Sequence, residues 1–232
     1  MRIVFMGTPD FAVPILDILV KNKCNIVGVI TAPDKPSGRG LKLHQSAVKE
    51  YALQHGLFIL QPEKLKSPEF IETLTALNAD LQIVVAFRML PEMVWRMPPK
   101  GTFNLHASLL PQYRGAAPIN YAIINGEKET GVTTFFLSHE IDTGHIILQE
   151  KCEIGSNETA GELHDKLMLI GAETVLKTVQ LIEKGDVKPI PQNVLLMGNL
   201  KTAHKIFKDN CIIPWENEAL VIHNFIRGLS PF

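Results

Sequence analysis

The chain has 232 residues, 46% of them hydrophobic, and a formal net charge of −1 at pH 7. This length supports one α/β core with a smaller appendage, and the near-neutral charge excludes a general attraction to nucleic acid, so RNA contacts require a local patch. No apolar run approaches the roughly 18 residues of a membrane span, and the three cysteines are scattered. We therefore expect a cytoplasmic protein with no membrane partner, no disulfide framework and no metal site.

The first half of the chain alternates short apolar runs with amphipathic segments. Pro14 lies within the first amphipathic segment and indicates a kink or a split helix start. This alternation predicts an α/β fold with a doubly wound, mostly parallel, Rossmann-like sheet and helices on both faces. The predicted strands cover 3–6, 25–31, 57–60, 81–86 and 101–106, and the predicted helices lie near 11–19, 46–55 and 68–77.

The second half predicts a strand pair followed by helical segments. Residues 131–137 and 146–150 read as the two strands of a hairpin. An apolar stripe predicts a long helix over 159–184. A polar helical stretch is expected over 199–208 and an amphipathic helix over 219–228.

A glycine-containing turn follows the first predicted strand, where a dinucleotide-binding loop would stand. Its sequence is Gly7-Thr-Pro-Asp-Phe-Ala12, so Pro9 replaces the second glycine that lets a backbone approach a pyrophosphate. A tight turn without a ligand is therefore the better interpretation, and a nicotinamide-dependent oxidoreductase is the weakest functional hypothesis.

A long loop over 32–44 carries three cations, Lys35, Arg39 and Lys42. Loops of this length without structure are uncommon in compact domains and tend to be functional or mobile. The cations could contact phosphates, although a basic loop is more often merely solvated.

Polar and apolar side chains alternate in Thr102-Phe-Asn-Leu-His106. A period of two places Asn104 and His106 on one face of a strand, about 7 Å apart at their α-carbons, so both can reach one substrate atom. The strand then ends in Ser108-Leu-Leu-Pro111, and open α/β sheets bind ligands at such carboxyl ends. Taken alone, however, Asn-x-His is more often an edge or loop-facing pair than a catalytic one.

A second element strengthens the catalytic interpretation. Asp142-Thr-Gly144 lies between the two predicted hairpin strands, which places Asp142 at a hairpin tip. The tripeptide by itself is usually only a turn. With Asn104 and His106, however, it completes a carboxamide, an imidazole and a carboxylate, which suffice for transferring an acyl group to an amine.

Three segments together carry a family likeness: Met6-Gly-Thr-Pro-Asp-Phe-Ala-Val-Pro14, the run from Asn104 to Pro111 with Arg114-Gly-Ala-Ala-Pro118, and Asp142-Thr-Gly144. Over its whole length the chain resembles the methionyl-tRNA formyltransferases. The resemblance implies transfer of a formyl group from 10-formyltetrahydrofolate to the α-amino group of methionine on initiator methionyl-tRNA.

The resemblance also implies how the chain is organised. We expect a catalytic domain over 1–189, a linker over 190–214 and, over 215–232, the beginning of a truncated C-terminal domain of the oligonucleotide-binding type. We also expect a monomer.

The same resemblance assigns roles to residues. Asn104 would donate to the oxyanion, His106 would stabilise it or pass a proton to the leaving nitrogen, and Asp142 would accept a proton from the amine. The basic loop with Lys35 and Arg39 would meet the tRNA acceptor end, together with Lys42. The folate would lie against Ala86, Phe87, Arg88, Met89 and Leu90, and near Ser108, Leu109, Leu110 and Pro111.

Other activities fit the same residues. The amine acceptor could be a sugar nucleotide or glycinamide ribonucleotide, or water could replace the amine in hydrolysis of the formyl folate. The long basic loop favours tRNA among these acceptors. A non-catalytic RNA-binding module is much less expected, because it has no reason to bring Asn104, His106 and Asp142 together.

Overall fold

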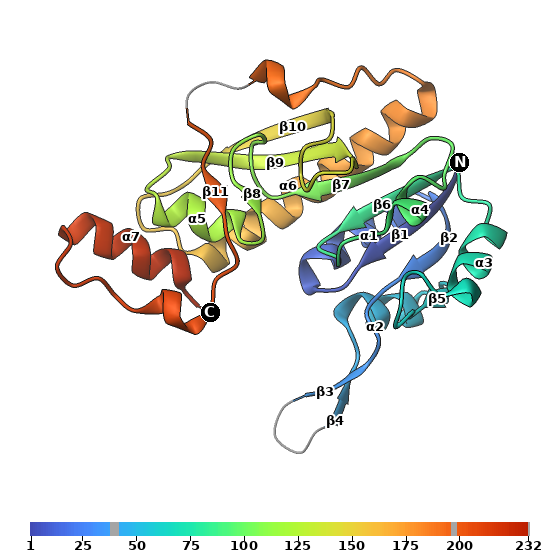
Figure 1. Ribbon diagram of the computed structural model, residues 1–232, viewed down its shortest axis with the longest axis horizontal. Helices are drawn as coiled ribbons and strands as arrows, with labels where there is room; N and C mark the ends of the chain where they lie inside the picture. Colours follow the sequence, from blue (N-terminus) through green and yellow to red (C-terminus); the bar gives the residue numbers. More distant parts are fainter. Residues whose placement is uncertain (38–41, 196–198, 232) are drawn as a thin grey trace. The chain divides into compact units, whose positions relative to one another are not determined.

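The computed structural model describes residues 1–37, 42–195 and 199–231. Their contacts divide the chain into two compact units, Met1–Leu105 with Val175–Asp186, and His106–Thr174 with Val187–Phe232. Figure 1 follows the elements along the chain from blue at the N-terminus to red at the C-terminus.

The first unit is built on parallel strands in the order β7-β6-β1-β2-β5. Every residue of β6 is buried, as are five of the six residues of β1, so both faces of these central strands are covered. The last residue of β7, His106, already belongs to the second unit. The bounds are β1 Arg2–Gly7, β2 Asn25–Ile30, β5 Ile59–Leu60, β6 Leu81–Val85 and β7 Thr102–His106.

The helices of the first unit begin where the sequence supplies start signals. The Ser46 side chain accepts a hydrogen bond from the Lys49 N–H at 3.1 Å and caps α2. Proline stands in the first turn of α1 and of α3, where no N–H partner is needed. A 3-10 turn over Asp10–Ala12 precedes α1, so the split start predicted from Pro14 is confirmed. The helices are α1 Val13–Lys21, α2 Ala47–Gln54, α3 Pro68–Ala76 and α4 Glu92–Trp95.

The order of these strands reverses at β1. The chain moves outward through β2 and β5 and then returns to the other side of β1 with β6 and β7. Gly7 pairs with Val85, so β1 and β6 end side by side. The doubly wound, mostly parallel sheet is confirmed, and ligands of such sheets bind outside the carboxyl ends at the reversal.

The loop after β2 contains regular structure that the sequence analysis did not predict. Two short strands, β3 Lys35–Ser37 and β4 Lys42–His44, pair antiparallel, with Lys35 opposite His44. The expectation of a structureless loop is therefore wrong at its two ends. Residues 38–41, which include Arg39, lie outside the described residues.

The second unit contains the predicted hairpin. Strands β9 Glu129–Phe136 and β10 Ile146–Glu153 pair antiparallel. Helix α6 Ala160–Lys184 confirms the long helix, and the division between the units falls within it. Helix α7 Ala219–Leu229 lies against α5 Pro118–Ile124 (Figure 1), and the Asn120 amide donates to the Gly228 carbonyl oxygen at 2.8 Å.

The helix predicted over 199–208 is wrong. Residues Thr202–Ala203 form strand β11, which pairs with β8 Arg114–Gly115, and a 3-10 turn covers Lys208–Cys211. The Lys201 carbonyl accepts from the Tyr113 N–H at 2.7 Å. Tertiary pairing of the backbone overrides the local helical preference here. Among the described residues, no helix is long and apolar enough to cross a membrane.

Candidate functional site

His106 and Asp142 form the centre of the candidate site in the second unit. His106 ends β7, and Asp142 lies in the loop that joins β9 to β10. The distance from His106 Nδ1 to Asp142 Oδ2 is 3.8 Å, and the two side chains are 7% and 12% exposed. This separation exceeds a hydrogen bond, but burial makes the electrostatic coupling of the two groups stronger than it would be in water.

The main chain around Tyr113 orients the imidazole. His106 Nε2 lies 2.8 Å from the Tyr113 carbonyl oxygen, which can only accept, so Nε2 carries a proton and donates it. Nδ1 is therefore the nitrogen that faces Asp142. Nε2 is held by the main chain and Nδ1 lies 3.8 Å from the Asp142 carboxylate, which favours a charge-stabilising role for His106 over direct proton delivery to the leaving nitrogen.

Main-chain contacts also fix the Asp142 carboxylate. The Gly115 N–H donates to Oδ2 at 3.0 Å, which places Oδ2 between Gly115 and His106. Asp142 has a φ of +55°, a left-handed conformation that aspartate tolerates better than most residues. Its hairpin-tip position agrees with the prediction, and Oδ1 is the oxygen best placed to accept an external proton.

Gly144 completes the turn because no larger residue fits there. A Cβ at this position would lie 1.6 Å from the Phe136 carbonyl oxygen. The Phe136 N–H donates to the His145 carbonyl at 2.9 Å, so the backbone at this contact is itself hydrogen-bonded. Glycine in Asp-Thr-Gly is therefore required by close backbone approach.

Gly144→Ala is expected to lower the free energy of unfolding by about 2 to 4 kcal/mol, because the backbone must shift to admit the methyl group. In thermal unfolding, the midpoint should fall by about 5 °C or more. Gly155→Ala is the control, since its Cβ would meet Glu158 at an ordinary 3.4 Å. Equal midpoints for the two variants would refute the close-approach argument.

Asn104 stands two residues before His106 on β7 and is half-buried. The two side chains belong to the same face of the strand, as the period of two predicts. Thr102, on that face too, is buried and donates to the Trp95 carbonyl at 2.7 Å. Both faces of β7 are thus largely enclosed, which suits a donor that must act away from bulk water.

The predicted folate-binding turn after β7 is held by its own contacts. The Ser108 hydroxyl donates to the Gln112 carbonyl at 2.6 Å, so it is committed to the turn and is not an activated nucleophile. Thr133 accepts from the Leu110 N–H at 3.1 Å. Leu110 is buried with Phe135 and Ile146. Leu109 is half-buried and Pro111 is buried.

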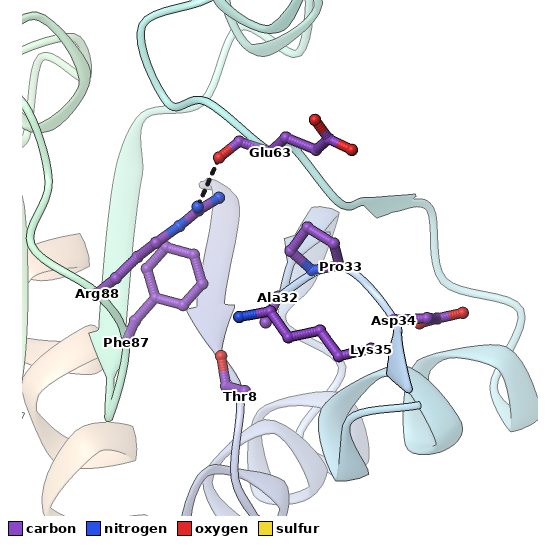
Figure 2. Close-up of a pocket in the computed structure, with 8 residues that line it drawn as sticks. All are labelled: Thr8, Ala32, Pro33, Asp34, Lys35, Glu63, Phe87 and Arg88. Carbon is purple, nitrogen blue, oxygen red and sulfur yellow. Dashed lines mark hydrogen bonds between the residues drawn. The ribbon is translucent and has the colours of Figure 1, made fainter. Parts of the chain in front are cut away.

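The first unit contains a cavity of about 470 Å³ at the carboxyl ends of its strands (Figure 2). It brings one predicted tRNA-binding residue, Lys35, together with two predicted folate-binding residues, Phe87 and Arg88. In Figure 2 the Lys35 side chain extends toward Thr8 and Phe87. The lining residues are Thr8, Ala32, Pro33, Asp34, Lys35, Glu63, Phe87 and Arg88.

Arg88 builds one wall of this cavity. Its Nη1 donates to the Glu63 carbonyl at 2.8 Å, and its Nη2 donates to the Pro62 carbonyl. Its guanidinium carbon lies 5.6 Å from the centroid of the Phe87 ring. Arg88 therefore fastens the loop after β6 to the loop after β5.

The other predicted folate-binding residues after β6 differ in exposure. Ala86 is exposed with a φ of +47°, Met89 is 72% exposed and Leu90 is buried. On the opposite side of the cavity, hydrogen bonds from Lys49 at 2.5 Å and Gln61 at 2.8 Å hold the pKa of Asp34 below its usual range. The Asp34 carboxylate is thus an anchor of the cavity rim.

Sequence reasoning missed three contributors to the candidate site. The Tyr113 carbonyl and the Gly115 N–H are main-chain groups, which no residue pattern reveals. Gln192 comes from the predicted linker and donates to the Asp142 carbonyl at 2.8 Å. Among the described residues, no group of three or more His, Cys, Asp or Glu is placed to hold a metal ion.

Comparison with known proteins identifies close relatives. The family model described as Formyl transferase matches residues 1–179. A methionyl-tRNA formyltransferase of Bacteroides fragilis is 60% identical over the whole chain, which spans 72% of that relative. A sugar 3N-formyl transferase, solved in the presence of dTDP and 5-N-formyl-THF, superposes with a TM-score of 0.73 at 24% identity, covering 98% of this chain and 78% of that one. A glycinamide ribonucleotide transformylase from Symbiobacterium toebii gives 0.69 at 20% identity, covering 82% and 94%.

Proposed function

We infer that this chain, which belongs to the formyl transferase family, transfers a formyl group from 10-formyltetrahydrofolate to the α-amino group of methionine on initiator methionyl-tRNA. The identity of the acceptor is inferred from the 60% identity to a methionyl-tRNA formyltransferase along the whole chain. The sugar and glycinamide ribonucleotide enzymes, at 24% and 20% identity, share the fold alone.

The chemistry begins with attack of the neutral amine on the formyl carbon. A new C–N bond forms, and the formyl oxygen becomes the oxyanion of a tetrahedral intermediate. The Asn104 amide donates to this oxygen, and its half-buried position limits competition from water. Collapse of the intermediate breaks the bond to N10 and leaves tetrahydrofolate.

Asp142 takes the proton of the attacking amine, and His106 stabilises the negative charge of the intermediate. Oδ1 of Asp142 accepts this proton, directly or through one water, while Gly115 and His106 hold Oδ2. When both ring nitrogens of His106 carry a proton, its positive charge stabilises the oxyanion. The proton that Asp142 took from the amine passes to N10, directly or through one water, as the bond to N10 breaks, so Asp142 returns to its carboxylate form.

Folate binding is assigned to two stretches of chain. The exposed backbone at Ala86 and the side chains of Phe87, Arg88 and Met89 offer donors, acceptors and apolar surface to a flat heterocycle, and Leu90, which is buried, ends the stretch. The second stretch is Ser108, Leu109, Leu110 and Pro111. The Ser108 hydroxyl supports the turn and the Leu110 N–H donates to Thr133, so the main-chain groups of the stretch that remain are the ones assigned to folate.

The basic loop is assigned to the acceptor end of the tRNA through Lys35, Arg39 and Lys42. Lys35 is exposed and lines the cavity at the carboxyl ends of the strands. Since translation initiation consumes the product, the enzyme acts in the cytoplasm. We also propose that the enzyme acts as a monomer.

Lys35→Ala is expected to raise the KM for methionyl-tRNA by about five- to tenfold, because one phosphate contact is lost. Affinity for the folate should stay within about twofold, and Arg39→Ala should behave in the same way. Steady-state formylation at two salt concentrations measures the effect. Lys100→Ala is the control, since this exposed lysine precedes the amino end of β7. Equal loss of tRNA use and folate binding would overturn the assignment.

An acceptor panel tests the proposed function. The purified chain is given 10-formyltetrahydrofolate with methionyl-initiator tRNA, a dTDP-amino sugar or glycinamide ribonucleotide, and formylated products are quantified by mass spectrometry. We expect formylmethionyl-tRNA to form with a kcat/KM at least about 100-fold above the other acceptors. Preferential formylation of the sugar or the ribonucleotide would contradict the proposal.

A further inference from the structure

Gln192 lies almost completely buried in the segment that follows α6. It begins a 3-10 turn, Gln192–Leu195, and is 3% exposed. Two residues earlier, Ile190 pairs with Ile146 at the start of β10 through two backbone hydrogen bonds of 2.8 Å. This pairing brings the segment alongside the loop that carries Asp142.

The Gln192 carboxamide is engaged at both ends. Its Nε2 donates to the Asp142 carbonyl at 2.8 Å and to the Gly144 carbonyl at 2.9 Å. Its Oε1 accepts from Arg114 Nη2 at 2.6 Å and from Arg114 Nε at 3.1 Å. One side chain therefore ties the main chain of the Asp-Thr-Gly turn to Arg114.

This tie bears directly on the Asp142 carboxylate. The residue after Arg114 is Gly115, whose N–H donates to Asp142 Oδ2. Gln192 thus holds the main chain of Asp142. Gly115, which follows the Gln192 partner Arg114 in the sequence, holds the Asp142 side chain. Asp142 also keeps a left-handed φ of +55°, which costs a non-glycine residue some free energy that surrounding contacts offset.

We propose that Gln192 is a positioning residue for Asp142. It clamps the Asp-Thr-Gly turn to Arg114, so that the carboxylate stays beside His106 and presents its free oxygen to the attacking amine. The effect on rate rests on the proposed function, whereas the effect on geometry does not. Displacing a reacting group by about 1 Å costs up to about 100-fold in rate.

Two substitutions separate the contacts of Gln192. Gln192→Glu keeps an acceptor for Arg114 but removes both donors to the turn, and Gln192→Met keeps the volume without charge or hydrogen bonds. Gln112→Glu is the matched control. Gln112 precedes Tyr113, and its side-chain oxygen accepts from the Lys201 N–H at 2.8 Å. It therefore joins two chain segments, as Gln192 does, but it makes no hydrogen bond to Asp142.

Single-turnover and steady-state formylation measure the effect on rate. We expect both Gln192 variants to lose about 10- to 100-fold in kcat, with KM values for folate and tRNA within about twofold. Gln112→Glu should stay within about twofold of the wild type. Loss of thermal stability with an unchanged kcat would overturn the proposal.

A double-mutant cycle with Asp142→Asn distinguishes positioning from general structural support. If Gln192 acts through the carboxylate, adding Gln192→Met to Asp142→Asn should lower the residual rate by less than about twofold. Full additivity of the two losses would refute the proposal.

NMR of the imidazole of His106 gives a readout that does not depend on activity. We expect its ring resonances to shift in Gln192→Met and to stay at the wild-type positions in Gln112→Glu. Unshifted resonances in Gln192→Met would refute the positioning role. If the wild type proved inactive but the His106 resonances still shifted in Gln192→Met, the proposed function would be refuted and the positioning role would remain supported.

Discussion

Asp142→Asn is expected to lower kcat by about 10²- to 10⁴-fold, with folate and tRNA binding preserved. An amide cannot take the proton of the attacking amine, but it keeps the size of the carboxylate. Its oxygen can still accept from the Gly115 N–H, so the turn should persist. The rate of formyl transfer under single-turnover conditions measures the loss, and equilibrium dialysis of a folate analogue measures binding.

A surface pair provides the matched control for this experiment. His164 Nδ1 and Asp165 Oδ1 lie 3.0 Å apart on α6, closer than the candidate pair, but the Asp165 side chain is 74% exposed. Asp165→Asn should therefore leave kcat unchanged. Equal activity of Asp142→Asn and the wild type would remove Asp142 from the mechanism, whatever its distance to His106.

Asn104→Ala is expected to lower kcat by about 10²- to 10³-fold, the cost of losing one good donor to an oxyanion. Because the donated bond strengthens as charge develops on the formyl oxygen, KM should change little. Steady-state kinetics with each substrate varied in turn separates the two parameters.

Asn22→Ala serves as the control, since that exposed amide donates to the Ile18 carbonyl at the end of α1. A tenfold rise in KM without a fall in kcat in the Asn104 variant would assign Asn104 to ground-state binding.

Much of the framework of the site could be predicted because it depends on local patterns. The period of two in residues 102–106 located Asn104 and His106 on one strand face, and the structure places β7 there. Two strand-like runs around Asp142-Thr-Gly144 predicted the hairpin, and β9 and β10 form it. Both are short-range signals that a single sequence carries.

The groups that hold the side chains of the candidate site could not be predicted in this way. Tyr113 orients His106 through its carbonyl, and Gly115 holds Asp142 through its N–H. Every residue has these main-chain groups, so the amino-acid type at either position does not predict the contact. Gln192 reaches a residue 50 positions earlier in the sequence. The helix expected over 199–208 failed for the same reason, because its backbone pairs with β8.

The cavity in the first unit gives another example of a contact that local sequence patterns do not predict. No local pattern in the sequence gives a structural reason for an arginine at position 88. The structure supplies one, since the guanidinium donates to two carbonyls of the loop after β5. Such a contact joins residues about 25 positions apart, beyond the reach of any local pattern.

The most direct test of the account is the stoichiometry of a single turnover. Enzyme in excess is mixed with 10-formyltetrahydrofolate and methionyl-initiator tRNA, and formylmethionyl-tRNA and free tetrahydrofolate are followed together by rapid quench. The account predicts that both products appear in equal amounts with one rate constant. Release of tetrahydrofolate without formylmethionyl-tRNA would show that water, and not the amine, is the acceptor, and would contradict it.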